Sequence, residues 1–274
     1  MLGVARRPGN FDHPHPVICI TPQPADPPYV YPQGCRQFGD KRMKTVLGQQ
    51  RADLRCLSEP SMIETLDIDH LVDELADGTP PSFLTPERLC VQDLVVVATE
   101  PGSGRYLGLL GAHQETAGGQ SYLRLDIACV APMWRGRRLM SRLLARAAAA
   151  RTRETPVLAA RTGTPAWFRA LRHFAFQIDG ATFHPAPAGS AVTLRTAAAA
   201  RQIATVLSPE HRYDIATGVL HGKRPMPIRT LPRHSSADAW CEAALDAAPL
   251  VSERLLAVID LRGVNRAALR ALAG

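Results

Sequence analysis

The alternation of apolar and polar positions is clearest from residue 93 onward. Two β-rich apolar runs, 93–99 and 106–111, flank a glycine-rich turn, which is typical of a hairpin. A third run, 122–130, follows a Gly-Gly turn and stops at Pro132. We expect three consecutive antiparallel strands here.

After Pro132 the spacing of apolar residues changes from every second residue, as in a strand, to about every 3.6 residues, as in a helix. Apolar residues at 139, 140, 143, 144 and 147, with arginines mostly between them, predict an amphipathic helix that ends near Arg153. Residues 156–161 read as a buried strand, and Thr164 caps a second helix. Residues 176–178 begin another strand in this interpretation. The strands on either side of the first helix should be parallel, because a crossover joins them.

The flanks of this region divide the chain further. Residues 1–42 are rich in proline and predict an extended or disordered arm. Residues 43–182 form the predicted core, which includes a short strand at 52–57. A helix is expected to begin at Ser61 or Glu64, with Leu75 as its last apolar position.

Residues 183–274 form a long C-terminal region with helix patterns at 197–207 and 237–247. Residues 255–261 are a strong strand pattern. Two alternatives remain open for this region: the strand completes the main sheet after an insertion, or a separate subdomain forms.

The net charge of the chain indicates which kind of binding partner it favours. The formal net charge of +7, from 32 basic and 25 acidic residues, favours anionic partners. The excess is modest and scattered apart from one knot of arginines near 135–142, so it does not indicate nucleic-acid binding as the main activity.

Six cysteines include no CxxC pair, which predicts reduced thiols in a cytoplasmic protein and no metal site. No apolar run reaches 18 residues and no secretory signal is recognisable, so we expect no membrane partner.

The stretch most informative about chemistry is 125–144, in which a strand ends, a basic loop follows and a helix begins. The first N–H groups of a helix lack internal partners and bind anions readily. Arg135, Arg137 and Arg138 add planar donors for phosphate oxygens, and Gly136 permits close approach of a ligand. The pattern therefore predicts a phosphate-binding loop.

This stretch resembles the acetyl-CoA signature of the GNAT superfamily of acyl-CoA N-acyltransferases. Val130-Ala131-Pro132 matches the end of the family's strand, and Arg135 matches the first signature position. Arg138 and Met140 stand where the family has a glycine and a second small residue. The segment from Thr164 to Phe176 has the length of the family's next helix, with Leu171 in the place of a tyrosine that often serves as general acid.

The resemblance implies an α/β (α+β) fold with a mixed, mostly antiparallel sheet flanked by helices. It implies acetyl-CoA as acyl donor, an amine of a small molecule or protein as acceptor, and often a homodimer. The donor would contact these residues: Cys129, Val130, Arg135, Gly136, Arg137, Arg138, Leu139, Met140, Ser141, Thr164 and Phe168. The N–H groups of Cys129 and Val130 would polarise the thioester carbonyl.

The general base is less well specified. The family often has a glutamate where this chain has Arg124, and Asp126 shares its face of the strand, so Asp126 is the tentative base. An alternative is a carboxylate that simply pairs with an arginine. We interpret His113 as an exposed residue at a strand end, the alternative being that it approaches the acceptor site. We interpret Cys129 as a packed strand residue, the alternative being a nucleophile that carries the acyl group.

Two functions therefore remain open. One is an N-acetyltransferase in which an amine attacks acetyl-CoA directly. The other is a catalytically reduced protein of the same fold that binds or regulates a partner, since the chain lacks the usual glycines, tyrosine and glutamate.

Overall fold

The computed structural model describes residues 52–75, 84–151, 154–163, 165–186, 193–221 and 254–274. Its helices are α1 (Pro60–Ile63), α2 (Ile68–Leu75), α3 (Pro86–Cys90), the 3-10 turn η1 (Pro132–Trp134), α4 (Leu139–Arg151), α5 (Pro165–Phe176), α6 (Leu194–Leu207) and α8 (Arg266–Ala273). Its strands are β1 (Asp53–Leu57), β2 (Leu94–Thr99), β3 (Tyr106–Ala117), β4 (Gln120–Val130), β5 (Val157–Thr162), β6 (Thr182–His184), β7 (Arg212–Tyr213), β8 (Val219–His221) and β9 (Arg254–Asp260).

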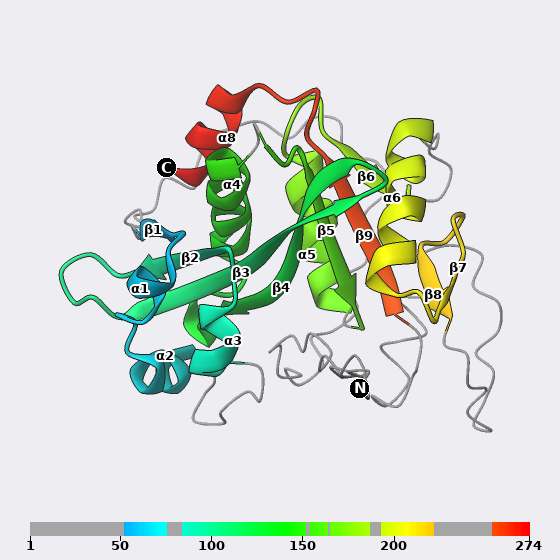
Figure 1. Ribbon diagram of the computed structural model, residues 1–274. Coiled ribbons are helices and arrows are strands. Elements are labelled where there is room, and N and C mark those ends of the chain that lie inside the picture. The colour runs from blue at the N-terminus through cyan, green and yellow to red at the C-terminus, as the bar shows by residue number, and fades with distance from the viewer. Residues whose placement is uncertain (1–51, 76–83, 152–153, 164, 187–192, 222–253) are drawn as a thin grey trace, which may run out of the picture.

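One sheet runs through the described residues in the order β1-β2-β3-β4-β5-β9-β8-β7, and β6 also pairs with β9 (Figure 1). Every pairing is antiparallel except that of β4 with β5. The predicted fold class is confirmed, as is the parallel pair on either side of the first long helix.

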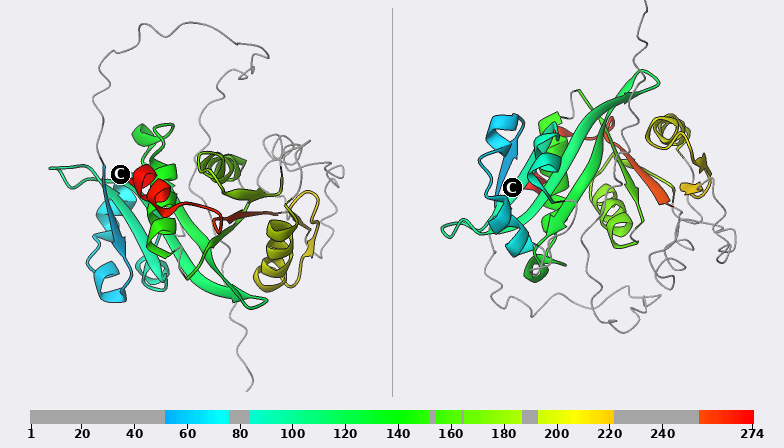
Figure 2. Two further views of the ribbon diagram at one scale, coloured as in Figure 1. Left: turned by 90° about the horizontal axis from the view of Figure 1, so that it is seen from above. Right: turned by 60° about the horizontal axis from the view of Figure 1, so that its bottom comes forward.

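Helices cover both faces of the sheet, as the view from above shows (Figure 2). Helices α4, α5 and α8 lie on one face, and α2, α3 and α6 lie on the other. The two faces can be followed along β3, where the backbone at Gly108 faces Leu139 and Leu143 of α4. Three residues on, the backbone at Gly111 faces the side chain of Gln92, which follows α3. Positions 108 and 111 face opposite sides of the sheet because successive residues of a strand alternate between its two faces.

Helix α4 forms as predicted, and its apolar side is buried against the sheet. Leu139, Leu143 and Leu144 are at most 1% exposed, and the alanines between them allow close packing. Burying one leucine side chain contributes roughly 1.5–3 kcal/mol. This packing fixes the start of α4 relative to the end of β4.

Two predicted elements differ in the structure. The helix expected over 61–75 is two helices, α1 and α2, and the second begins where Asp67 accepts a hydrogen bond from the N–H of His70 at 3.0 Å. The strand expected at 176–178 was wrong. Helix α5 continues through Phe176 because its apolar spacing persists to Phe174 and Ala175, which are buried.

The C-terminal region contributes directly to the sheet. Strand β9 pairs with β5 over the whole length of β5, from Val157↔Asp260 to Thr162↔Leu255. The predicted helix at 197–207 is present as α6, and β7 and β8 follow it as a short hairpin. The Pro-rich arm and the helix expected at 237–247 lie outside the described residues, and the proposed domain boundaries stay a prediction.

Candidate active site

Strands β4 and β5 separate soon after they meet. Their register contains only Leu123↔Leu158 and Arg124↔Ala159, although β4 continues to Val130. The register between β3 and β4 shifts between Gly111 and Ala112, which leaves Asp126 as an extra residue in β4. Such a bulge bends its strand and increases the local twist. We call this region, residues 123–130 of β4 and 158–162 of β5, the β4–β5 fork.

The direction of the backbone groups in β4 follows from one hydrogen bond. The N–H of Ala131 donates to the carbonyl of Leu107 at 2.9 Å, and this pair continues the register of Cys129 with Leu109. Because antiparallel pairs alternate, the N–H of Cys129 points toward β3, and that of Val130 points toward the fork.

The N–H of Cys129 does not face the fork, which contradicts the expectation that it polarises a thioester carbonyl, whereas the same role for Val130 stays a prediction. The thiol of Cys129 is buried and faces the carbonyl of Leu75 at 3.6 Å, as expected for a packed residue.

The loop between β4 and α4 is anchored by its tryptophan. Trp134 is buried, and the guanidinium of Arg137 lies over its ring at 5.8 Å. Arg135 turns back, and its Nε donates to the carbonyl of Val130 at 3.2 Å. Gly136 has a positive φ of 74° and open space around it. The loop therefore presents exposed backbone and arginine side chains beside the fork.

Helix α4 begins directly after Arg138. The first helical bond runs from the N–H of Arg142 to the carbonyl of Arg138 at 3.2 Å. The N–H groups of Leu139, Met140 and Ser141 precede it and thus have no acceptor within the helix. The side chains of Leu139 and Ser141 are buried, so these residues would meet an anion through the backbone.

One other residue of the predicted donor site lies in the core. Phe168 has no exposed surface and packs on Phe183 with ring centroids 5.5 Å apart, which makes it a core residue. Its predicted contact with the donor is corrected accordingly. Thr164 lies outside the described residues. Leu171 is buried, so α5 offers no hydroxyl at the position of the family's tyrosine.

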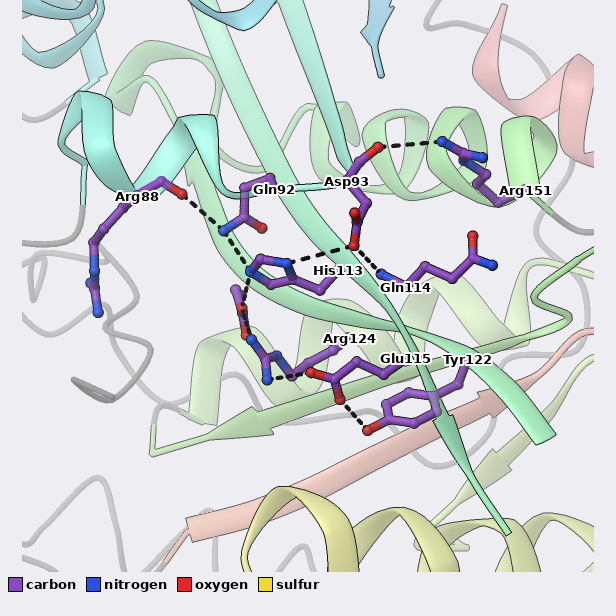
Figure 3. A network of polar contacts seen from close by, with 10 residues as sticks. Arg88, Gln92, Asp93, His113, Gln114, Glu115, Tyr122, Arg124 and Arg151 are labelled. Atoms are coloured by element: carbon purple, nitrogen blue, oxygen red, sulfur yellow. Dashed lines mark hydrogen bonds and ion pairs between the residues drawn. The ribbon is translucent and has the colours of Figure 1, made fainter. Parts of the chain in front are cut away.

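A polar network lies on the sheet face that α2, α3 and α6 share (Figure 3). Arg124 donates through Nη1 to Glu115 Oε1 at 2.5 Å and through Nη2 to Asp126 Oδ2 at 2.7 Å. Tyr122 donates to the second oxygen of Glu115. Tyr122 is packed in the same buried cluster as α6, which fixes the face. Two carboxylates thus share one guanidinium at the base of the fork.

His113 belongs to this network, and the interpretation of it as an exposed residue at a strand end was wrong. It lies within β3 opposite Arg124 in the register, and its side chain is only 18% exposed. Its Nε2 lies 3.1 Å from Asp126 Oδ2, and its Nδ1 lies 3.7 Å from Asp93 Oδ2. Sequence reasoning considered His113 for the acceptor site but favoured an exposed position, because the cross-strand register that brings it beside Asp126 was unknown.

The electrostatics of Asp126 follow from these contacts. Burial raises its pKa, but the hydrogen bonds from His113 and Arg124 outweigh burial and hold the pKa below the usual range for a carboxyl. Asp126 is therefore ionised at neutral pH. Burial and the bond to Glu115 raise the pKa of Tyr122, so this phenol stays protonated.

No group of three or more side chains in the described part of the chain could hold a metal ion. None of the helices in those residues is long and apolar enough to cross a membrane.

Comparison with known proteins gives likenesses at the level of structure. No protein-family model matches the chain, and no curated protein does. An acetyltransferase from Trypanosoma brucei is 18% identical over 53% of this chain and 100% of its own, with a TM-score of 0.36. An aminoglycoside acetyltransferase from an uncultured soil metagenomic sample is 19% identical over 40% of this chain and 78% of its own, with a TM-score of 0.31.

A GNAT-family acetyltransferase from Brucella melitensis, solved in complex with acetyl-CoA, is 20% identical over 40% of this chain and 75% of its own, with a TM-score of 0.31. All three solved structures are acetyltransferases, and each likeness covers 53% of this chain or less.

Proposed function

We propose that this chain is a GNAT-type N-acyltransferase that moves an acetyl group from acetyl-CoA to an amine. The observation that supports this function best is the β4–β5 fork, which opens beside the start of α4. A fork of this kind leaves backbone donors and acceptors of β4 without a neighbouring strand, next to a loop built for an anion.

The residues present fit the donor. Its diphosphate would bind the N–H groups that begin α4, where the helix dipole adds partial positive charge. Arg135, Arg137 and Arg138 supply formal charge around the same point. Its pantetheine amides would pair with backbone groups of β4 that point into the fork, as a strand would. The N–H of Val130 would then face the thioester carbonyl.

The acceptor would approach from the opposite face of the sheet. Asp126 lies at the bulge beside the fork, on the face that α2, α3 and α6 share, whereas α4 covers the other face. Asp126 and Glu115 outnumber Arg124, and this excess of carboxylate attracts a cationic amine. Asp126 is the candidate for the first proton acceptor from the ammonium.

A specific observation favours the second candidate function, a protein of this fold that binds CoA weakly or not at all. Leu171 is buried where a tyrosine acid would stand, and Arg138 fills the place of a glycine. In this case the polar face would bind a partner without chemistry on it.

Calorimetric titration with acetyl-CoA separates the two functions. We expect micromolar binding by the wild type and a loss of at least tenfold in the double variant Arg135→Ala, Arg138→Ala, since each charge-assisted bond to phosphate is worth about 1.5–3 kcal/mol. The control is Arg169→Ala, Arg212→Ala, which removes the same charge from exposed positions on α5 and β7.

Turnover is then measured as release of free thiol with a panel of aminosugars, arylalkylamines, polyamines and lysine peptides. Binding with turnover supports the acetyltransferase. Micromolar binding without turnover on any amine contradicts the transfer reaction and leaves only the binding of the donor. An absence of binding at millimolar acetyl-CoA contradicts the proposal outright and favours the second candidate.

A further inference from the structure

His113 stands between two carboxylates of different exposure. Asp126, on one side, is 17% exposed and lies at the fork, whereas Asp93, on the other, is 53% exposed and lies at the surface. We propose that His113 relays the proton of the acceptor amine from Asp126 to Asp93 and so to solvent. This inference rests on the proposed function, and it deepens that function by naming the route by which the proton leaves.

The inner step of this route has hydrogen-bonding geometry. His113 Nε2 lies 3.1 Å from Asp126 Oδ2, within the range of an N–H···O bond. Arg124 donates to the same oxygen, which fixes the carboxylate in place. A proton that reaches Asp126 therefore has one adjacent ring nitrogen to receive it.

Gln92 provides a hydrogen-bond donor to His113 Nε2 when that nitrogen carries no proton. The Nε2 of Gln92 lies 3.1 Å from His113 Nε2 and also donates to the carbonyl of Arg88 at 3.0 Å (Figure 3). Because a carbonyl only accepts, it orients the amide with its NH₂ group toward His113. His113 Nε2 can thus donate to Asp126 when it carries a proton, and accept from Gln92 when it does not. His113 Nε2 therefore has a hydrogen-bond partner both before and after the proton is transferred.

The outer step leads to water. His113 Nδ1 lies 3.7 Å from Asp93 Oδ2, a gap that a small ring rotation or one bridging water closes. Asp93 is held in position because its Oδ2 accepts from the N–H of Gln114 at 2.8 Å and its carbonyl accepts from Arg151 at 3.3 Å. Its exposed carboxylate can exchange protons with buffer.

The charged groups around the ring come from several elements. Arg124 and Asp126 face it from β4, Asp93 faces it from the start of β2, and Glu115 lies two residues along β3. Helix α3 contributes the neutral amide of Gln92 just beyond its end. The ring therefore connects a half-buried carboxylate to an exposed one, and acidic groups outnumber basic groups around it.

The proton balance is simple. The acceptor ammonium gives one proton through Asp126 and His113 to Asp93 and solvent, and the free amine then attacks the thioester carbon. A C–N bond forms and the C–S bond breaks. The second proton of the nitrogen leaves as the amide forms and accompanies the thiolate, which gives one amide, one free thiol and one proton in solution.

The test uses the most active amine of the panel and follows kcat/KM against pH. His113→Gln should lower kcat/KM at neutral pH on the order of 100-fold, as expected for loss of a proton-transfer group. The deficit should shrink as pH rises, because the amine then arrives already unprotonated. Asp93→Asn should give a smaller loss that added imidazole buffer restores, since its position is open to solvent.

Matched controls are His173→Gln on α5 and Asp179→Asn, both exposed and away from the network, which should keep the wild-type profile. Binding of acetyl-CoA by calorimetry should be unchanged in all four variants. A pH profile for His113→Gln that parallels the wild type, or no effect of imidazole on Asp93→Asn, would overturn the relay. Binding of acetyl-CoA without turnover on any amine also overturns it, whereas absence of binding refutes the proposed function instead.

Discussion

Arg138 holds a left-handed backbone conformation, with φ 61°, directly before α4. A side chain in this conformation costs roughly 1–2 kcal/mol, whereas glycine adopts it freely. The sequence showed Arg138 in the place of a glycine of the GNAT signature. The structure gives the physical reason for that glycine, because the chain must turn here for the N–H groups of α4 to face outward.

Replacing Arg138 with glycine should therefore stabilise the protein. We expect Arg138→Gly to raise the free energy of unfolding by about 1 kcal/mol, measured by urea denaturation. The control is Arg137→Gly, because Arg137 has no positive φ and its guanidinium lies over Trp134. That variant should lose stability, and a gain of the same size in both would contradict the explanation by strain.

At this scale the residues of the loop were easier to identify from the sequence than the contact between His113 and Asp126. Arg135 and Gly136 were recognisable because they are adjacent in the chain and match a linear signature. His113 and Asp126 are 13 positions apart in numbering and meet only through the register of two strands, shifted by a bulge. Nothing in the local pattern reveals a bulge, since Asp126 continues the alternation that a regular strand would show.

Among the elements, β6 and β7 are joined by a buried histidine. His184 is 1% exposed, and its Nε2 lies 2.8 Å from the hydroxyl of Tyr213. Burial lowers the pKa of His184 to about 4, so the ring is neutral in the folded protein at neutral pH. The unfolded chain has an ordinary histidine pKa of about 6.5 at this position.

This difference predicts a loss of stability in mild acid. Between pH 6.5 and about 4 the unfolded state binds a proton that the folded state does not, so the free energy of unfolding falls as pH falls. The full effect is about 3 kcal/mol at 1.36 kcal/mol per pKa unit. Urea denaturation at pH 7 and pH 4.5 should show it.

His184→Gln should reduce this pH dependence, while His173→Gln, at an exposed position, should keep it. Equal slopes for wild type and His184→Gln would contradict the assignment. Asp126 contributes in the same direction at lower pH. Its depressed pKa provides stability above the ordinary carboxyl range, and this stability is lost as pH falls through the folded-state value.

The sequence predicted the elements from β2 to α5 in kind and order because each has a strong period of its own. The boundary at Phe176 was missed because an aromatic residue fits a strand or a helix equally well, and tertiary packing decided it. The position of β9 beside β5 could not be chosen from sequence, because about 90 residues separate the two strands and only their pairing identifies them as neighbours.

In the molecule as a whole, two parts of the sheet meet at the fork. Strands β1 to β4 lie on one side and β5 with β9 on the other, with two register pairs between β4 and β5. Helix α4 reinforces the junction, since Arg142 in its first turn donates to the carbonyls of Ala52 and Gly274, each at 3.0 Å. Arg142 thus ties β1 and α8 to α4, and it is not free to bind phosphate with the other arginines of the loop.

A ligand that fills the fork should therefore stabilise both parts of the sheet together. At 100 times its Kd, acetyl-CoA should raise the free energy of unfolding by about 2.7 kcal/mol. Hydrogen exchange should slow at the amides of Ala128 and Val130, which point into the fork, and at those of 139–141, where the ligand would accept bonds, and should stay unchanged in α6. The Arg135→Ala, Arg138→Ala variant should lose both effects, and so should the wild type in high salt, because exposed charges are screened.

Protection spread evenly over the chain, or confined to α6, would mean that the fork is not where acetyl-CoA binds. Protection at 139–141 alone would mean that the loop binds a phosphate while the fork stays empty, as expected of a protein that has kept the fold and lost the transfer reaction.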